Sequence, residues 1–149
     1  MTEFVLHASL SLPLARQQVF AFFADARNLG RITPPELHFE IISPPVAVQV
    51  GTLIDYRIRL FGIPLRWRTE ITRWNPPNEF EDVQLRGPYA VWVHRHTFRD
   101  AGEGTLIEDE VRYRLPFGVI GRLAHPIVRL QLRRIFSYRQ RMVEQLLLR

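Results

Sequence analysis

Residues 89–115, YAVWVHRHTFRDAGEGTLIEDEVRYRL, decide the fold, because they have the pattern of two strands joined by one tight turn. Apolar and polar side chains alternate over 89–99 and again over 105–115, as in strands that bury one face. The turn between them, Ala101 to Gly104, is too short for the crossover that parallel strands need. We therefore expect an antiparallel hairpin here.

The same alternation extends from this hairpin toward the N-terminus. It predicts further strands over 3–11, 38–43, 52–61, 64–74 and 79–86. Glycine and proline separate most of these segments at short intervals, so neighbouring strands are expected to be antiparallel. Between the first two strands, helical spacing predicts an amphipathic helix over 14–24. A second short helix follows it and ends before Thr33-Pro34-Pro35.

The C-terminal tail is predicted to be helical. Its apolar residues recur at helical spacing and form one stripe over 127–148: Val128, Leu132, Ile135, Phe136, Met142, Val143, Leu146 and Leu147. Arg139 lies on this stripe and interrupts it. A shorter helical piece is expected over 119–124. Because Pro126 disfavours helix at His125, we expect a kink or a restart there, with His125 at the surface or at a hinge.

These elements predict an α+β fold in which a seven-stranded curved antiparallel sheet grips the long C-terminal helix. A bent sheet cannot close everywhere against one helix, so a cavity is expected between them. Strand alternation places mostly apolar side chains, with a few polar exceptions, on the inner face. The residues expected to bind a ligand there are Tyr56, Ile58, Trp67, Thr69, Asp82, Gln84, Arg86, Trp92, His94, His96, Asp109, Tyr113, Leu132 and Phe136.

The order of elements resembles the START-like, or SRPBCC, helix-grip superfamily, which includes polyketide cyclase/dehydrases, coenzyme Q-binding proteins and lipid-transfer domains. The motifs that carry the resemblance are Leu12-Pro13 with Val19–Asp25, Phe61–Trp67 and Gly87–Phe98. The last two are similar to a bacterial ligand-binding branch. The resemblance covers residues 1–149 and implies one domain with a binding pocket under the long helix. It implies no catalytic residues, because the superfamily shares none.

A polar patch on the otherwise apolar inner face of the sheet contains the residues that are best suited to catalysis or to orienting a ligand. Its members come from three consecutive strands and are expected to meet across them: Asp82, His94, His96 and Asp109. The histidines have three interpretations: hydrogen-bonded interior residues that orient a ligand, a general base with its orienting partner, or metal ligands completed by one aspartate. We favour the first interpretation and expect neither a metal nor a cofactor.

Other features leave similar choices open. Arg86 can clamp a ligand carboxylate, or it can reach solvent from the end of its strand. The tryptophans on the strands can stack on a planar ligand or fill the core. Two loops, over 30–37 and 61–64, and the segment 117–126 are rich in proline and glycine, and we expect them to be candidate gates to the cavity.

Composition excludes several kinds of chemistry. The 149 residues contain no cysteine, which rules out disulfides, zinc–thiolate sites and thiol catalysis. All 20 basic residues are arginine, which rules out Schiff-base lysine chemistry. The net charge is +5, but no basic run occurs, so no nucleic-acid partner is expected. A charged leader and an apolar run of roughly 20 residues are both missing, which predicts a cytoplasmic location.

Three functions remain. The main hypothesis is binding of a small hydrophobic molecule, such as a lipid, an isoprenoid quinone or a polyketide-like aromatic compound. The alternative is a cyclase/dehydratase-type enzyme that uses the pairs His94/His96 and Asp82/Asp109 as its acid–base groups. The third is an interaction protein, in which an exposed Trp74 or the arginine-rich helix face contacts a protein or a membrane surface. The sequence assigns no oligomeric state.

Overall fold

The computed structural model describes residues 2–44 and 47–148. Within these residues, seven strands form one antiparallel sheet in the order β1-β7-β6-β5-β4-β3-β2. The strands are β1 (Phe4–Leu12), β2 (Glu40–Ile41), β3 (Leu53–Leu60), β4 (Ile63–Asn75), β5 (Glu79–Arg86), β6 (Val91–Ala101) and β7 (Gly104–Arg114). Each strand from β2 to β7 pairs with its neighbour in the chain, and β1 closes the order beside β7, so the expected antiparallel meander is confirmed.

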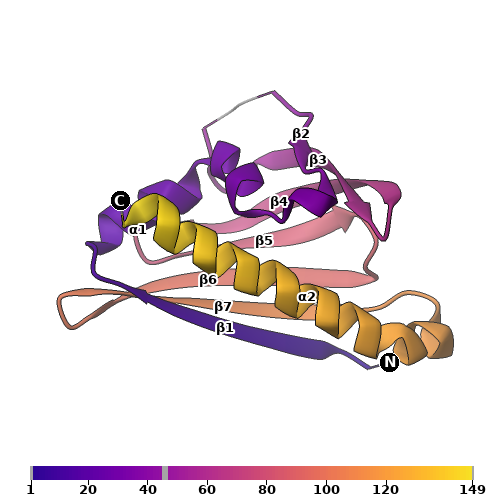
Figure 1. Cartoon of the computed structure of the whole chain (residues 1–149). Coiled ribbons are helices and arrows are strands. Elements are labelled where there is room, and N and C mark those ends of the chain that lie inside the picture. The colour runs from indigo at the N-terminus through magenta and orange to yellow at the C-terminus, as the bar shows by residue number, and fades with distance from the viewer. Residues whose placement is uncertain (1, 45–46, 149) are drawn as a thin grey trace.

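The helices lie on one face of this sheet. Between β1 and β2 the chain forms α1 (Arg16–Ala24) and two 3₁₀ turns, η1 (Ala26–Ile32) and η2 (Pro35–Leu37). The long helix α2 (Gly118–Leu147) crosses the sheet, and its C-terminal end lies near α1 (Figure 1). This arrangement confirms the predicted helix-grip fold.

The core confirms the predicted inner faces of the sheet. On β6 the alternate residues from Trp92 to Phe98 are all buried, and on β7 Val111 is fully buried. Two apolar clusters result. One gathers around Trp67 and Trp92 under the middle of α2, and the other gathers around Phe98, where α1 and the C-terminal end of α2 pack. The polar groups between these clusters are therefore held on a rigid sheet.

The structure corrects the expected break before Pro126. α2 runs without interruption from Gly118 to Leu147, with Pro126 inside it. His125 is half-buried rather than at a hinge: its ring stacks on Phe4 with centroids 3.5 Å apart, and its Nε2 lies 2.8 Å from the hydroxyl of Tyr113. These contacts hold the helix to β1 and β7, and they offset the hydrogen bond that proline removes.

Two smaller expectations were also wrong. The strand expected over 38–43 is only the two-residue β2, because His38 adopts a left-handed conformation and the chain leaves the sheet after Ile41. Trp74 is half-buried rather than exposed, with its ring packed against Phe20 and Phe80. It therefore cannot serve as a free contact for a partner.

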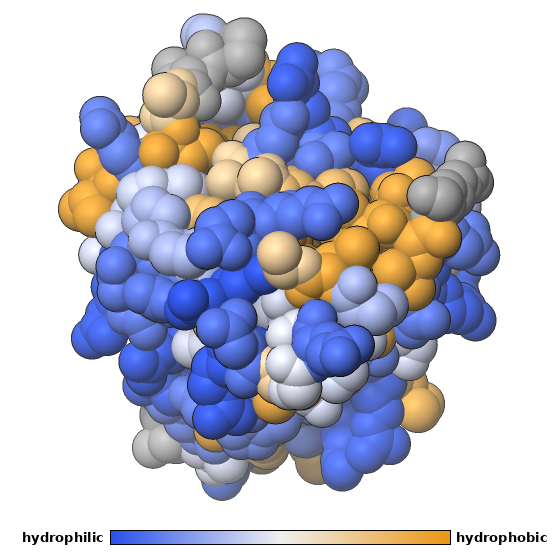
Figure 2. All heavy atoms as spheres, turned by 90° about the vertical axis from the view of Figure 1, so that its left-hand side faces the viewer, coloured by the Kyte–Doolittle hydropathy of each residue, from blue (hydrophilic) through white to orange (hydrophobic). Residues whose placement is uncertain are grey.

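In the parts of the chain that the structure describes, no helix has both the length and the apolar character needed to cross a membrane. Figure 2 shows the face formed by α1 and the C-terminal end of α2, where apolar residues gather in separate orange areas with polar residues between them.

Candidate functional site

A cavity of about 170 Å³ lies between the inner face of the sheet and α2. Its wall is mainly aromatic and aliphatic and comes from β3, β4, β5, β6 and α2, with the segment that contains η1 and η2 closing one side. The polar atoms on this wall come from a few residues, among them Asp82, His94, His96 and Arg139. Such a hollow, apolar with a few convergent polar groups, is the usual form of a small-molecule site.

The structure brings most of the residues expected to bind a ligand to this one wall. They are Tyr56, Ile58, Trp67, Thr69, Asp82, Trp92, His94, His96, Leu132 and Phe136. The alternation of β3, β4, β5 and β6 places the strand residues there, and the apolar stripe of α2 places the other two.

Four expected residues lie elsewhere. The Gln84 side chain forms hydrogen bonds with the backbone N–H and C=O of Tyr89. Arg86 is exposed at the end of β5, where the solvent alternative applies. Tyr113 is buried against α2, where its hydroxyl contacts His125. Asp109 is buried behind the two histidines and supports them rather than lining the wall.

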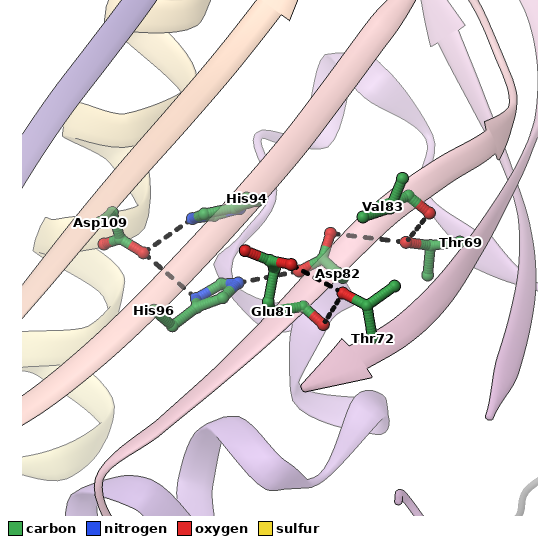
Figure 3. Close-up of polar contacts among 8 residues, drawn as sticks. All are labelled: Thr69, Thr72, Glu81, Asp82, Val83, His94, His96 and Asp109. Atoms are coloured by element: carbon green, nitrogen blue, oxygen red, sulfur yellow. Dashed lines mark hydrogen bonds and ion pairs between the residues drawn. The ribbon is translucent and has the colours of Figure 1, made fainter. Parts of the chain in front are cut away.

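A chain of alternating carboxylates and imidazoles crosses three strands beside the cavity (Figure 3). Asp109 accepts a hydrogen bond of 2.8 Å from Nε2 of His94, and Asp82 accepts one of 2.9 Å from Nε2 of His96. Nδ1 of His96 lies 3.2 Å from the same Asp109 oxygen, as an ion-pair contact without hydrogen-bond alignment. The two imidazole rings stack with centroids 3.6 Å apart. At the far end, the Thr69 hydroxyl approaches Asp82 at 3.4 Å.

The strand register explains why these groups meet. Asp82 lies opposite His94 on β5 and β6, and His96 lies opposite Asp109 on β6 and β7. All four side chains leave the same face of the sheet, so each ring reaches a carboxylate on a neighbouring strand.

Both carboxyl groups of the chain are stabilised in their ionised form. Burial alone would raise the pKa of Asp82, but the hydrogen bond from His96 and nearby positive charges lower it overall. Burial opposes ionisation of Asp109 as well, yet the hydrogen bond from His94 and the close approach of the His96 imidazole hold its pKa well below 3.8. Asp109 is the more strongly shifted because both imidazoles approach it.

The two histidines shift in opposite directions. Burial and the charge of His96 lower the pKa of His94 to about 4, although its bond to Asp109 opposes this change. Burial would also lower the pKa of His96, but the contacts with Asp109 and Asp82 raise it above 6.5. These directions favour a state in which both aspartates are ionised, His96 is protonated and His94 is neutral.

Arg139 of α2 is the charged wall residue that was absent from the expected ligand-binding set. Its guanidinium carbon lies 5.3 Å from the ring centre of Phe23 and 5.8 Å from that of Phe136. Its positive charge helps to lower the pKa values of Asp82 and Asp109. The signal was visible in the sequence, because Arg139 interrupts an otherwise apolar stripe.

Comparison with known proteins assigns this chain to a family. Residues 12–136 match the polyketide cyclase/dehydrase and lipid transport family. The chain belongs to this family. No protein with a curated description matches the sequence.

Solved structures share the fold of this family member. A START superfamily protein from Mycobacterium smegmatis has a TM-score of 0.72 at 12% identity, with 95% of this chain and 98% of that chain covered. A protein from Thermus thermophilus has a TM-score of 0.68 at 21% identity, covering 95% and 94%. A nucleoside-diphosphate sugar epimerase from Corynebacterium glutamicum is 26% identical with a TM-score of 0.68, and covers 94% of this chain but only 28% of its own. The expected resemblance to START-like proteins is thereby confirmed.

Within the family fold, three residues could together hold a metal ion. The ligand atoms offered by Asp82, His94 and His96 all lie within 4.8 Å of one another, and two imidazoles with one carboxylate are a common set for iron or zinc. Nε2 of each histidine, however, already faces a carboxylate, and the charge of Arg139 nearby disfavours a cation. The three side chains are of the kinds that bind iron or zinc, but the nearby positive charge opposes a bound cation. The expectation of no metal stays a prediction.

Proposed function

We propose that residues 1–149 form one domain that binds a small hydrophobic molecule in the cavity under α2. The observation that carries this proposal is the cavity itself, an aromatic and aliphatic hollow with a polar chain along one wall. Apolar surface buried there would contribute affinity at about 25 cal/mol per Å². The chain of Asp82, His96 and His94 would orient the polar end of the ligand.

The size of the cavity narrows the choice of ligand. At about 170 Å³ it is smaller than the roughly 300–1,000 Å³ of most ligand pockets. An engineered cavity of about 150 Å³ holds benzene, so one compact ring system suits the hollow. A lipid or an isoprenoid quinone would need the segment with η1 and η2 to move outward. The geometry therefore supports a compact aromatic compound better than a long chain.

Filling the cavity should abolish ligand binding. Ala24 lines the hollow at the end of α1, and Ala24→Phe would place a ring inside it. We expect mass spectrometry of organic extracts from the purified protein to show a bound apolar compound that this variant loses. We also expect titrated naphthalene to bind the variant at least ~10-fold more weakly. Ala101→Phe, which adds the same ring at an exposed site, is the matched control.

Two results would end the proposal: extracts without any bound compound together with no naphthalene binding by the unaltered protein, or equal binding by the Ala24→Phe variant. Thermal unfolding of both variants checks that the fold is intact.

Acid–base catalysis is a second candidate, and the opposite pKa shifts of the histidines favour it. Neutral His94 can accept a proton and protonated His96 can donate one, as a dehydration or ring closure requires. Incubating the protein with an added aromatic compound before the same extraction separates the two functions. A carrier returns the compound with which it was loaded, whereas an enzyme returns one changed by loss of water or by ring closure.

We also propose that the N-terminal half of α2 contacts anionic membranes. Its outer face carries large apolar side chains at helical spacing, each at least 60% exposed: Ile120, Leu123, Ile127 and Leu130. Arg122 and Arg129 are exposed in this half of the helix, and no acidic residue occurs between Gly118 and Leu132. An amphipathic helix with this composition suits the interface of an anionic bilayer, from which an apolar ligand could be exchanged.

Vesicle binding tests this membrane contact. We expect the protein to sediment with phosphatidylserine–phosphatidylcholine vesicles, less so with rising salt, and the double variant Ile120→Ser, Leu123→Ser to bind at least ~10-fold more weakly. Leu85→Ser, at an exposed site on β5, should bind normally. Equal sedimentation of the double variant and the unaltered protein would contradict the contact.

A further inference from the structure

The guanidinium of Arg139, at the cavity wall, has an unpaired hydrogen-bond donor. Its Nη2 atom is buried and lacks a hydrogen-bond partner. Asp82 and Asp109 influence it only through their charge, since no ion pair joins Arg139 to a carboxylate within the described chain, and both aspartates already accept from histidines. Phe23 and Phe136 hold the group in place through their ring faces.

A second free donor belongs to another residue that lines the same cavity, Trp67 of β4. Nε1 of Trp67 is buried and has no hydrogen-bond partner among residues 2–44 and 47–148, and the whole residue is only 6% exposed. The Trp67 ring is fixed by packing against Trp92, with centroids 5.4 Å apart and planes at 90°. An indole N–H can only donate, and a buried donor that stays unpaired costs free energy.

We infer that the ligand is an apolar ring compound that carries an oxygen acceptor, a carbonyl or a carboxylate, which accepts hydrogen bonds from Arg139 and Trp67. This inference rests on the proposed function. It deepens that function because an apolar wall alone would accept a plain hydrocarbon, whereas unpaired donors select an oxygen-bearing relative.

Charge balance favours a carbonyl over a carboxylate. In the state that the pKa shifts favour, two ionised aspartates face one protonated histidine and Arg139, so the cluster is neutral as a whole. A carbonyl oxygen leaves this balance unchanged while it accepts a charge-assisted hydrogen bond. A carboxylate would add one buried negative charge, which neutral His94 could offset only by taking up a proton.

Three naphthalene probes of similar size test the inference by isothermal titration calorimetry: 2-acetylnaphthalene, 2-naphthoate and 2-ethylnaphthalene. We expect the ketone to bind about 10- to 100-fold more tightly than the ethyl compound. Arg139→Met should remove most of this preference, so that the variant binds the ketone and the ethyl compound with affinities within about 3-fold of each other. Trp67→Phe alone, which keeps a ring but lacks the N–H, should also reduce the preference for the ketone over the ethyl compound. Arg141→Met, at an exposed position of the same helix, is the matched control.

The outcomes separate this inference from the proposed function. Tighter binding of the ketone or of 2-naphthoate that depends on Arg139 supports an oxygen acceptor, and the tighter of the two identifies its charge. Equal binding of all three probes, or a preference that survives Arg139→Met, overturns the inference but leaves hydrophobic binding intact. Failure of every probe to bind the unaltered protein removes the proposed function itself.

Discussion

Replacing Asp109 with alanine should lower the free energy of unfolding by about 3–5 kcal/mol. Asp109 is 8% exposed, and its carboxylate faces both imidazoles of the chain, at 2.8 Å from His94 and 3.2 Å from His96. Its removal leaves the protonated His96 with Asp82 as its one remaining partner in the chain, and leaves the His94 donor unpaired in an apolar surrounding. A cavity at the centre of the sheet adds to the loss.

The measurement is urea unfolding, and the expected loss corresponds to a thermal midpoint lower by roughly 6–20 °C. Glu110→Ala removes a carboxylate from the opposite face of the same strand and should change the free energy by no more than about 0.5 kcal/mol. Asp109→Asn keeps the side-chain volume and one hydrogen-bond acceptor, so its loss of unfolding free energy should lie between those of Asp109→Ala and Glu110→Ala. A loss in Asp109→Ala no greater than that in Glu110→Ala would show that the chain carries no buried charge.

The sequence was enough to predict the sheet, because the determinants of β6 and β7 are local. Alternation fixed the buried face of β7, the preference of aromatic side chains for burial selected the face of β6 that carries Trp92 and Phe98, and the short Ala101–Gly104 turn fixed the antiparallel pairing. The meeting of Asp82 with His96 followed from the same reasoning, since inward residues of consecutive strands share one surface. β2 was overestimated because its alternation competes with the left-handed conformation at His38.

The features that the sequence did not predict depend on contacts between segments far apart in the chain. The continuity of α2 through Pro126 depends on the packing of His125 against Phe4, more than a hundred residues away. Alternation placed Asp109 inward but could not show that it lies behind the histidine rings, because that depends on the orientation of the side chains. Arg139 was visible as a break in the apolar stripe, yet its place at the wall is fixed by the angle at which α2 crosses the sheet.

The unusual state of His94 should make the protein lose stability in mild acid. Its pKa is about 4 in the folded chain and 6.5 in the unfolded chain, so the unfolded state binds the proton first as the pH falls. The contribution of His94 to folding is therefore fully present above pH 6.5 and is lost progressively toward pH 4. A shift of this size corresponds to about 3 kcal/mol. The neighbouring groups change stability in other pH ranges. The aspartates lose their contribution to the free energy of unfolding only below pH 3.8, because their pKa values are lowered. His96 loses its contribution as the pH rises through its raised pKa.

Urea unfolding between pH 4 and 7 measures this effect, and His94→Gln should remove most of the dependence, because glutamine stays neutral over the whole range. The variant should also be less stable than the unaltered protein at pH 7, since its amide fits the Asp109 contact less well, and the two curves should converge toward pH 4. His7→Gln, at an exposed position of β1, should retain the full dependence on pH. If the free energy of unfolding of the His94→Gln variant still falls by about 3 kcal/mol across this window, another group takes up the proton and folding does not lower the pKa of His94.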